Sequence, residues 1–103
     1  MGTVVRKPSL YNAERVCIVC GSPYVEQHHI YGGNGRRAVS DREGCTVFLC
    51  HWHHQGAAGV HFYPPLDDWL KRDCQKRWME REGATVEEFI KVFGCSYLEG
   101  STE

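Results

Sequence analysis

Two short spacings of metal-binding residues constrain this chain most. Cys17 and Cys20 form a Cys-x-x-Cys pair, and Cys50 and His53 form a second pair with the same gap. Two such pairs suit the four corners of a closed, tetrahedral zinc site with three sulfur ligands and one nitrogen ligand. The sequence therefore predicts a small fold stapled by one structural zinc. The alternative is a coincidental spacing within an ordinary small core.

Histidines are concentrated in and beside this pattern. All six lie between His28 and His61, and the adjacent doublet His28-His29 falls between the two ligand pairs. The zinc site needs one of them, so the others are surplus to the scaffold. Surplus imidazoles are candidates for chemistry, because histidine is mostly neutral and basic at cellular pH and also binds transition metals. The alternatives are structural histidines with satisfied hydrogen bonds, or zinc binding by a different subset.

Length and composition set the broad class. A chain of 103 residues is expected to form one domain, of a size that gains from a metal staple. No apolar run is long enough to cross a bilayer and no signal peptide pattern opens the sequence, so a cytoplasmic protein without membrane contact is expected. Cys45, Cys74 and Cys95 are then expected to be reduced, buried thiols. Nothing in the sequence indicates the oligomeric state.

The local patterns predict a small α+β fold. The expected divisions are an N-terminal arm at 1–15, a single domain at 16–98 and a frayed tail at 99–103. The elements expected within the domain are a strand at 24–28, a loop at 31–44, a strand at 46–49, a short helix or turn after His53, and helices at 66–82 and 85–93. Thr85 and Glu88 have the spacing of a capping box at the start of the last helix. Trp52 is expected to cap the core, and His51 to be solvated.

The order of these motifs resembles the HNH (ββα-metal) endonuclease family. The resemblance rests on Cys17-x-x-Cys20, on His28-His29-Ile30 and on Leu49-Cys50-x-x-His53-His54, and it covers roughly residues 16–61. It implies a zinc-stabilised ββα-metal core at 16–62 and a helical extension of about two helices at 66–94. The glycine-rich loop at 31–37, the segment at 59–62 and the helical tail also resemble a phage-borne subgroup of RecA-dependent nucleases.

The resemblance assigns roles to the ligands. The residues implied for the structural zinc are Cys17, Cys20, Cys50 and His53. The residues implied for catalysis are His29 as the general base, and His28 and His54 as ligands of a catalytic divalent metal. His61 is either a third ligand of that metal or a packing residue. Imidazoles without a carboxylate suit Mn²⁺ or Ni²⁺ better than Mg²⁺, which prefers oxygen ligands.

One position departs from the family pattern. The central Asn of that family would fall at position 45, where this chain has Cys45. In the family this Asn side chain braces the loop that carries the general base, and a thiol is too weak a hydrogen-bond donor to do the same. Either Asn34 or Thr46, which lie nearby in the sequence, takes over the bracing, or the activity is reduced.

DNA is the expected partner. Candidate phosphate contacts are Arg36, Arg37, Lys71 and Arg72, and a merely solvated surface is the alternative for each. The formal net charge is −1, so unaided DNA binding is expected to be weak, and a recombination or packaging protein would compensate.

Three functions are compatible with these patterns. The preferred one is a metal-dependent DNA endonuclease, which would act in the bacterial host cytosol if a phage encodes it. The second is an inactive, zinc-stapled nucleic-acid-binding or adaptor module, for which Cys45 is the motivating feature. The third is a protein-interaction domain whose acidic end, at 80–103, docks a basic partner.

Overall fold

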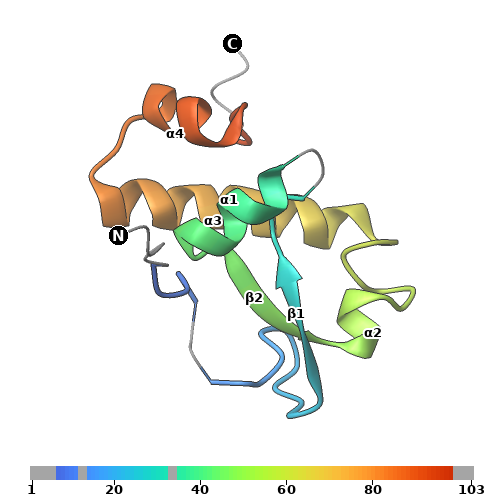
Figure 1. Cartoon of the computed structure of the whole chain (residues 1–103). Helices are drawn as coiled ribbons and strands as arrows, with labels where there is room; N and C mark the ends of the chain where they lie inside the picture. The colour runs from blue at the N-terminus through green and yellow to red at the C-terminus, as the bar shows by residue number, and fades with distance from the viewer. Residues whose placement is uncertain (1–6, 12–13, 33–34, 99–103) are drawn as a thin grey trace.

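A two-stranded sheet with helices packed around it forms the molecule (Figure 1). This computed structural model describes residues 7–11, 14–32 and 35–98. Its elements in chain order are β1 (Val25–His29), α1 (Arg36–Glu43), β2 (Thr46–Cys50), α2 (His51–His54), α3 (Pro64–Glu82) and α4 (Val86–Phe93). The small α+β class predicted from the sequence is confirmed. The expected tail at 99–103 lies outside the described residues.

Strand pairing joins the two predicted ligand pairs. β1 and β2 run antiparallel, with Val25 opposite Cys50. The chain that has just left the first cysteine pair therefore lies beside the start of the second pair. The backbone N–H of Ile18 also donates to the carbonyl of Phe48 at 3.0 Å, which ties the Cys-x-x-Cys turn to β2. The sheet register alone brings both halves of the expected zinc site to one place.

The loop expected at 31–44 contains a helix, α1, of eight residues, so that prediction was wrong. Glycines before the helix and its few apolar residues conceal any amphipathic pattern. The helix ends at Gly44, which has φ 81°, a left-handed conformation that favours glycine. Ser40, fully buried, accepts a hydrogen bond from the N–H of Tyr31 at 3.0 Å and donates one to its carbonyl at 2.7 Å. α1 is thus fixed to the chain that leaves β1.

The two C-terminal helices were predicted closely. α3 begins at Pro64, two residues before the predicted start, and its proline suits a first helical turn. The capping box of α4 is confirmed, since Thr85 and Glu88 each accept a hydrogen bond from the other's backbone N–H. Trp69 on α3 is 44% exposed, whereas Leu70, Cys74 and Trp78 of the same helix are buried.

Aromatic rings fill the space between α3, α4 and the end of β1. Phe89 stacks on Phe93 with ring centroids 4.4 Å apart, and Trp78 meets Phe93 edge to face at 5.4 Å. Tyr31, which follows β1 closely in sequence, packs against Phe93 at 4.9 Å. Such contacts bury large apolar areas in preferred geometries. The helical extension therefore anchors the segment that leaves the histidine doublet.

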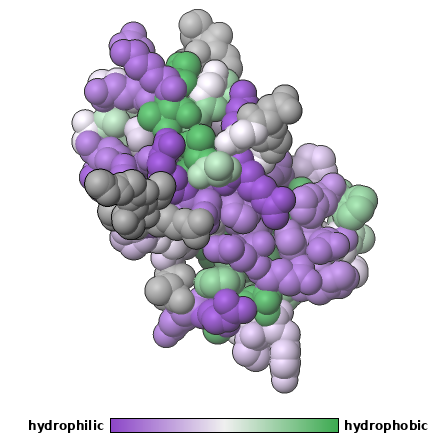
Figure 2. All heavy atoms as spheres, in the orientation of Figure 1, coloured by the Kyte–Doolittle hydropathy of each residue, from purple (hydrophilic) through white to green (hydrophobic). Residues whose placement is uncertain are grey.

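The burial of Trp52 and of Cys95 differs from expectation. Trp52 is 56% exposed and does not cap the core, because α2 is a single turn that buries none of its residues. All six cysteines are free thiols, of which Cys45 and Cys74 are buried as expected and Cys95 is half-buried. The face in Figure 2 is largely hydrophilic, with hydrophobic residues in small separate areas. Among the described residues, no helix is long and apolar enough to cross a membrane.

Residues 7–11 of the expected N-terminal arm pack against the domain. The N–H of Leu10 donates to the carbonyl of Gly44 at 2.9 Å. The hydroxyl of Tyr11, a buried residue, donates to Asp73 on α3 at 2.7 Å. Asp73 also accepts from Arg77, which confirms the i,i+4 pair that their spacing suggests.

Glu43 is a buried carboxylate that joins the arm, α1 and α3. Its side chain is 8% exposed and accepts hydrogen bonds from Lys7 at 2.7 Å and from the indole of Trp78 at 3.0 Å. Arg42 donates another at 3.0 Å. Burial alone would raise the pKa of the Glu43 carboxyl, but these donors outweigh burial and lower the pKa to about 2.

Replacing Glu43 with Gln is expected to lower the free energy of unfolding at pH 7 by about 1–3 kcal/mol, because charge-assisted bonds in a buried site are lost. A carboxyl with a lowered pKa stabilises the fold fully above its ordinary value of 4.5, and this contribution is lost as the pH falls toward 2. Urea unfolding with excess zinc should show a gap between the unfolding free energies of wild type and Glu43→Gln that is constant down to about pH 5 and narrows as the pH falls below 4.5. Glu87→Gln, at an exposed position on α4, is the control and should match wild type. A gap that does not change with pH would contradict this account.

Candidate metal centres

The four residues predicted to bind zinc form one cluster. Ligand atoms of Cys17, Cys20, Cys50 and His53 all lie within 4.8 Å of one another. The sulfurs of Cys20 and Cys50 are 3.7 Å apart, and Nδ1 of His53 is 3.3 Å from the sulfur of Cys50. A tetrahedral zinc with Zn–S bonds of about 2.3 Å would hold two sulfurs about 3.8 Å apart. The group is therefore consistent with a closed Cys3His zinc site.

The local backbone favours the thiolate form of one ligand. Cys17 is buried, which by itself would raise the pKa of its thiol. Backbone hydrogen bonds at Cys50, Cys20 and Val19 act in the opposite direction and lower the pKa to about 6. Since zinc binds the thiolate and not the thiol, this environment prepares Cys17 for coordination.

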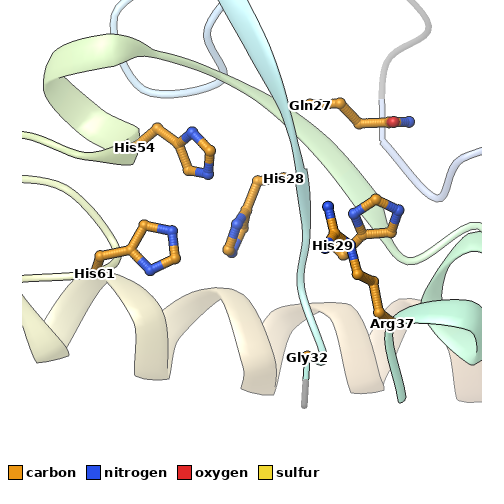
Figure 3. Close-up of a pocket in the computed structure, with 7 residues that line it drawn as sticks. All are labelled: Gln27, His28, His29, Gly32, Arg37, His54 and His61. Atoms are coloured by element: carbon orange, nitrogen blue, oxygen red, sulfur yellow. The ribbon is translucent and has the colours of Figure 1, made fainter. Parts of the chain in front are cut away.

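A second cluster consists of three histidines. Ring nitrogens of His28, His54 and His61 lie within 4.8 Å of one another. The ring centroid of His28 is 5.1 Å from that of His54 and 5.6 Å from that of His61. Figure 3 shows the three rings facing one another on one side of β1. His28 is buried, His54 half-buried and His61 exposed, so the cluster is open on one side.

The Nε2 atom of His28 is the strongest indication that the three rings can hold a metal. This atom is buried and has no hydrogen-bond partner among the described residues. Burial, followed by the charges of His54 and His61, lowers the pKa of His28 to about 3, so its imidazole is neutral at cellular pH. A buried polar atom without a partner costs about 1–3 kcal/mol. A divalent metal among the three rings would satisfy this nitrogen, so the residues fit such a metal.

Gly59 lets His61 reach the cluster. The N–H of Val60 donates to the carbonyl of His53 at 3.0 Å, which folds the loop back on α2. A side chain at Gly59 would lie 2.8 Å from backbone atoms of His53 and His54, closer than real contacts allow. The return of the loop therefore requires glycine, and it places His61 beside His54.

His28 and His29 leave β1 on opposite sides, yet both line one pocket (Figure 3). This pocket has a volume of about 330 Å³. Its lining residues are Gln27, His28, His29, Gly32, Arg37, His54 and His61. Nε2 of His29 lies 3.7 Å from a carboxylate oxygen of Asp41 on α1. The doublet thus faces a shared pocket.

The four basic residues proposed for DNA contact have different surroundings. Arg37 lines the histidine pocket, and Lys71 lines a neighbouring hollow of about 380 Å³ together with His28. Arg36 instead lies over Gly94, where an added side chain would be 2.8 Å from its guanidinium. Arg72 is exposed and lines neither hollow. The structure therefore brings two of the four near the histidines.

Position 45 does not supply a side chain to the pocket. Cys45 is fully buried, and a hydrogen bond with Cys74 together with burial raises the pKa of its thiol. Its backbone carbonyl accepts a hydrogen bond from Ile30 at 3.0 Å, directly after the doublet. Asn34, one of the alternatives considered for bracing, lies outside the described residues.

Three residues near the histidines escaped the sequence analysis. Glu26 lies 2.6 Å from Nδ1 of His54, and its position two residues before His28 on a strand was a usable signal, because such residues share a face. Ser40 and Asp41 could not be recognised, since both belong to the unexpected helix α1.

Comparisons with protein-family models, with curated proteins and with solved structures found no match to the chain.

Cys20→Ser tests the zinc cluster with little loss of packing, because Cys20 is exposed. We expect one tightly held zinc in the purified wild type and none in the variant. The free energy of unfolding should fall on the order of 5 kcal/mol or more, because metal binding and folding are coupled. Elemental mass spectrometry and thermal unfolding measure both effects. Cys95→Ser, outside both clusters, should keep its zinc, and retention of zinc by Cys20→Ser would refute the ligand assignment.

Proposed function

We propose that this protein is a metal-dependent DNA endonuclease of the HNH type. The observation that carries the proposal is the buried, unpartnered Nε2 of His28, which faces two further imidazoles beside the pocket that His29 also lines. β1, β2 and α2 would form the ββα-metal core, with the Cys3His cluster as its structural zinc site. His28, His54 and His61 would hold one divalent metal.

The chemistry divides between the metal and His29. A bound divalent metal would stabilise negative charge on the phosphoryl oxygens and on the departing 3′ oxygen of DNA. His29 would take a proton from the attacking water, a task suited to a neutral imidazole. Asp41 lies 3.7 Å from Nε2 of His29, a distance at which its charge acts on the ring without a hydrogen bond. The carboxylate would then stabilise the imidazolium that forms.

Two sets of hydrogen bonds can compensate for Cys45, which stands where the HNH family has an Asn. Ser40 bonds both the N–H and the carbonyl of Tyr31, so the chain just after the general base is held by a side chain from α1. The carbonyl of Cys45 holds Ile30 in the same segment. These hydrogen bonds can supply the bracing that an Asn side chain gives elsewhere. They support an active enzyme over an inactive binding module.

Arg37 and Lys71 are the best-placed contacts for the phosphates that flank the scissile bond, since they border the histidines. Lys71 is paired with Asp67 at 2.9 Å, which reduces its net attraction for DNA. With a formal net charge of −1, unaided affinity for DNA would be low. A recombination or packaging protein in the host cytosol would compensate by delivering the DNA.

Incubation with supercoiled plasmid tests the function. Wild type should nick the plasmid in the presence of Mn²⁺, and His29→Ala should be at least about 100-fold slower because the general base is lost. His29→Ala should still bind both metals. Lys76→Ala is the matched control, because Lys76 is exposed on α3 and lines neither hollow, and it should retain most activity. Equal cleavage by His29→Ala would exclude His29 as the base, whereas salt-sensitive DNA binding by a wild type that never cleaves would favour the inactive module.

The ligand set predicts the metal preference. Three imidazoles suit Mn²⁺ or Ni²⁺ better than Mg²⁺. Nicking rates at matched metal concentrations, with the structural zinc retained, should therefore be higher with Mn²⁺ or Ni²⁺. Equal or faster nicking with Mg²⁺ alone would refute the assignment of His28, His54 and His61 as the ligands.

A further inference from the structure

Glu26 lies behind the histidine cluster. Its Oε1 is 2.6 Å from Nδ1 of His54, the shortest polar contact that either cluster makes with a neighbouring side chain of the described residues. Glu26 and His28 are two residues apart on β1 and therefore share a face of the strand. One face of β1 thus carries both His28 and the Glu26 carboxylate that contacts His54.

The contact fixes the chemistry of the His54 ring. A carboxylate accepts hydrogen bonds, so Nδ1 of His54 carries the proton that it donates to Glu26. The lone pair of the ring is then on Nε2. Metal-binding histidines commonly donate their other ring N–H to a carboxylate, which fixes the tautomer and ring orientation and makes the ligand more basic.

We propose that Glu26 is a positioning residue for the second metal, holding His54 in the tautomer and orientation in which Nε2 joins His28 and His61 as a ligand. The proposal rests on the proposed function only in taking the three histidines as a divalent metal site. It does not depend on DNA or on cleavage. The carboxylate does not coordinate the metal itself, since Glu26 is not among the residues whose ligand atoms converge.

Glu26 also contacts His51 of α2 and Gln55, which follows α2. A structural role of Glu26 therefore has to be separated from a positioning role. Its Oε2 is 3.6 Å from Nδ1 of His51, and the side-chain amide of Gln55 donates to Oε1 at 3.4 Å. Both contacts are longer than the bond to His54. A residue that only pinned α2 would affect folding and zinc retention, but not the protonated nitrogen of one imidazole.

Titration of the zinc-loaded protein with Mn²⁺, in the absence of DNA, tests the proposal. Glu26→Ala should weaken Mn²⁺ binding about 10- to 100-fold, the usual effect of removing such a partner, and Glu26→Asp should restore part of it. Zinc content and melting temperature should stay near those of wild type. Glu80→Gln, an exposed glutamate on α3, is the matched control and should bind Mn²⁺ like wild type.

Nitrogen-15 NMR of the histidine rings, before Mn²⁺ is added, gives the independent readout. His54 should be the Nδ1–H tautomer in wild type and a mixture of tautomers in Glu26→Ala. Unchanged Mn²⁺ affinity in Glu26→Ala, an Nε2–H tautomer for wild-type His54, or no Mn²⁺ binding by wild type would each overturn the proposal.

The outcomes for Glu26 and for the nuclease function are distinguishable. Mn²⁺ binding that depends on Glu26, together with no plasmid nicking in any metal, would support the role of Glu26 and reject the nuclease. Nicking that depends on His29, together with Mn²⁺ binding that is unchanged in Glu26→Ala, would support the nuclease and reject the role of Glu26.

Discussion

The antiparallel pairing of β1 with β2 is the interaction on which both clusters depend. It places the Cys17–Cys20 turn beside Cys50, and so completes the Cys3His group. The same pairing presents His28 toward the turn of helix that follows β2. A two-stranded sheet of this length has little stability of its own in water. Bound zinc would therefore stabilise the very pairing that creates its site, so that coordination and sheet formation act as one cooperative unit.

The two clusters differ in the number of ligand atoms that they can offer a metal and in how exposed these atoms are. The sulfur-rich cluster has four ligands at tetrahedral spacing, which leaves no position for a further ligand. The histidine cluster has three candidate ligands, one of them exposed, so a metal bound there would keep open positions for water or for an anionic group. A carboxylate, Glu26, lies next to His54 of this cluster, and Asp41 lies near the neighbouring His29. Neutral imidazoles backed by carboxylates are a common way to combine metal binding with proton transfer.

Short-range spacing carried most of what could be predicted from the sequence. The ligand pairs, both strands and the two C-terminal helices follow from patterns a few residues long, and the bounds differ by no more than two residues. Features that depend on distant contacts were not predictable. α1 shows no amphipathic pattern, and with it Ser40 and Asp41 were missed. The sequence left His61 open between a ligand and a packing residue, because its place depends on a close backbone approach at Gly59, which leaves no periodic signal.

His53 and His54 are consecutive residues in a single turn of helix, and each belongs to a different cluster. One peptide unit thus connects the scaffold to the open pocket. Any shift of His53 on loss of zinc would also move His54, because the two residues are joined by one peptide unit within a helical turn. Loss of zinc from the Cys3His cluster would therefore also change the geometry of the histidine cluster.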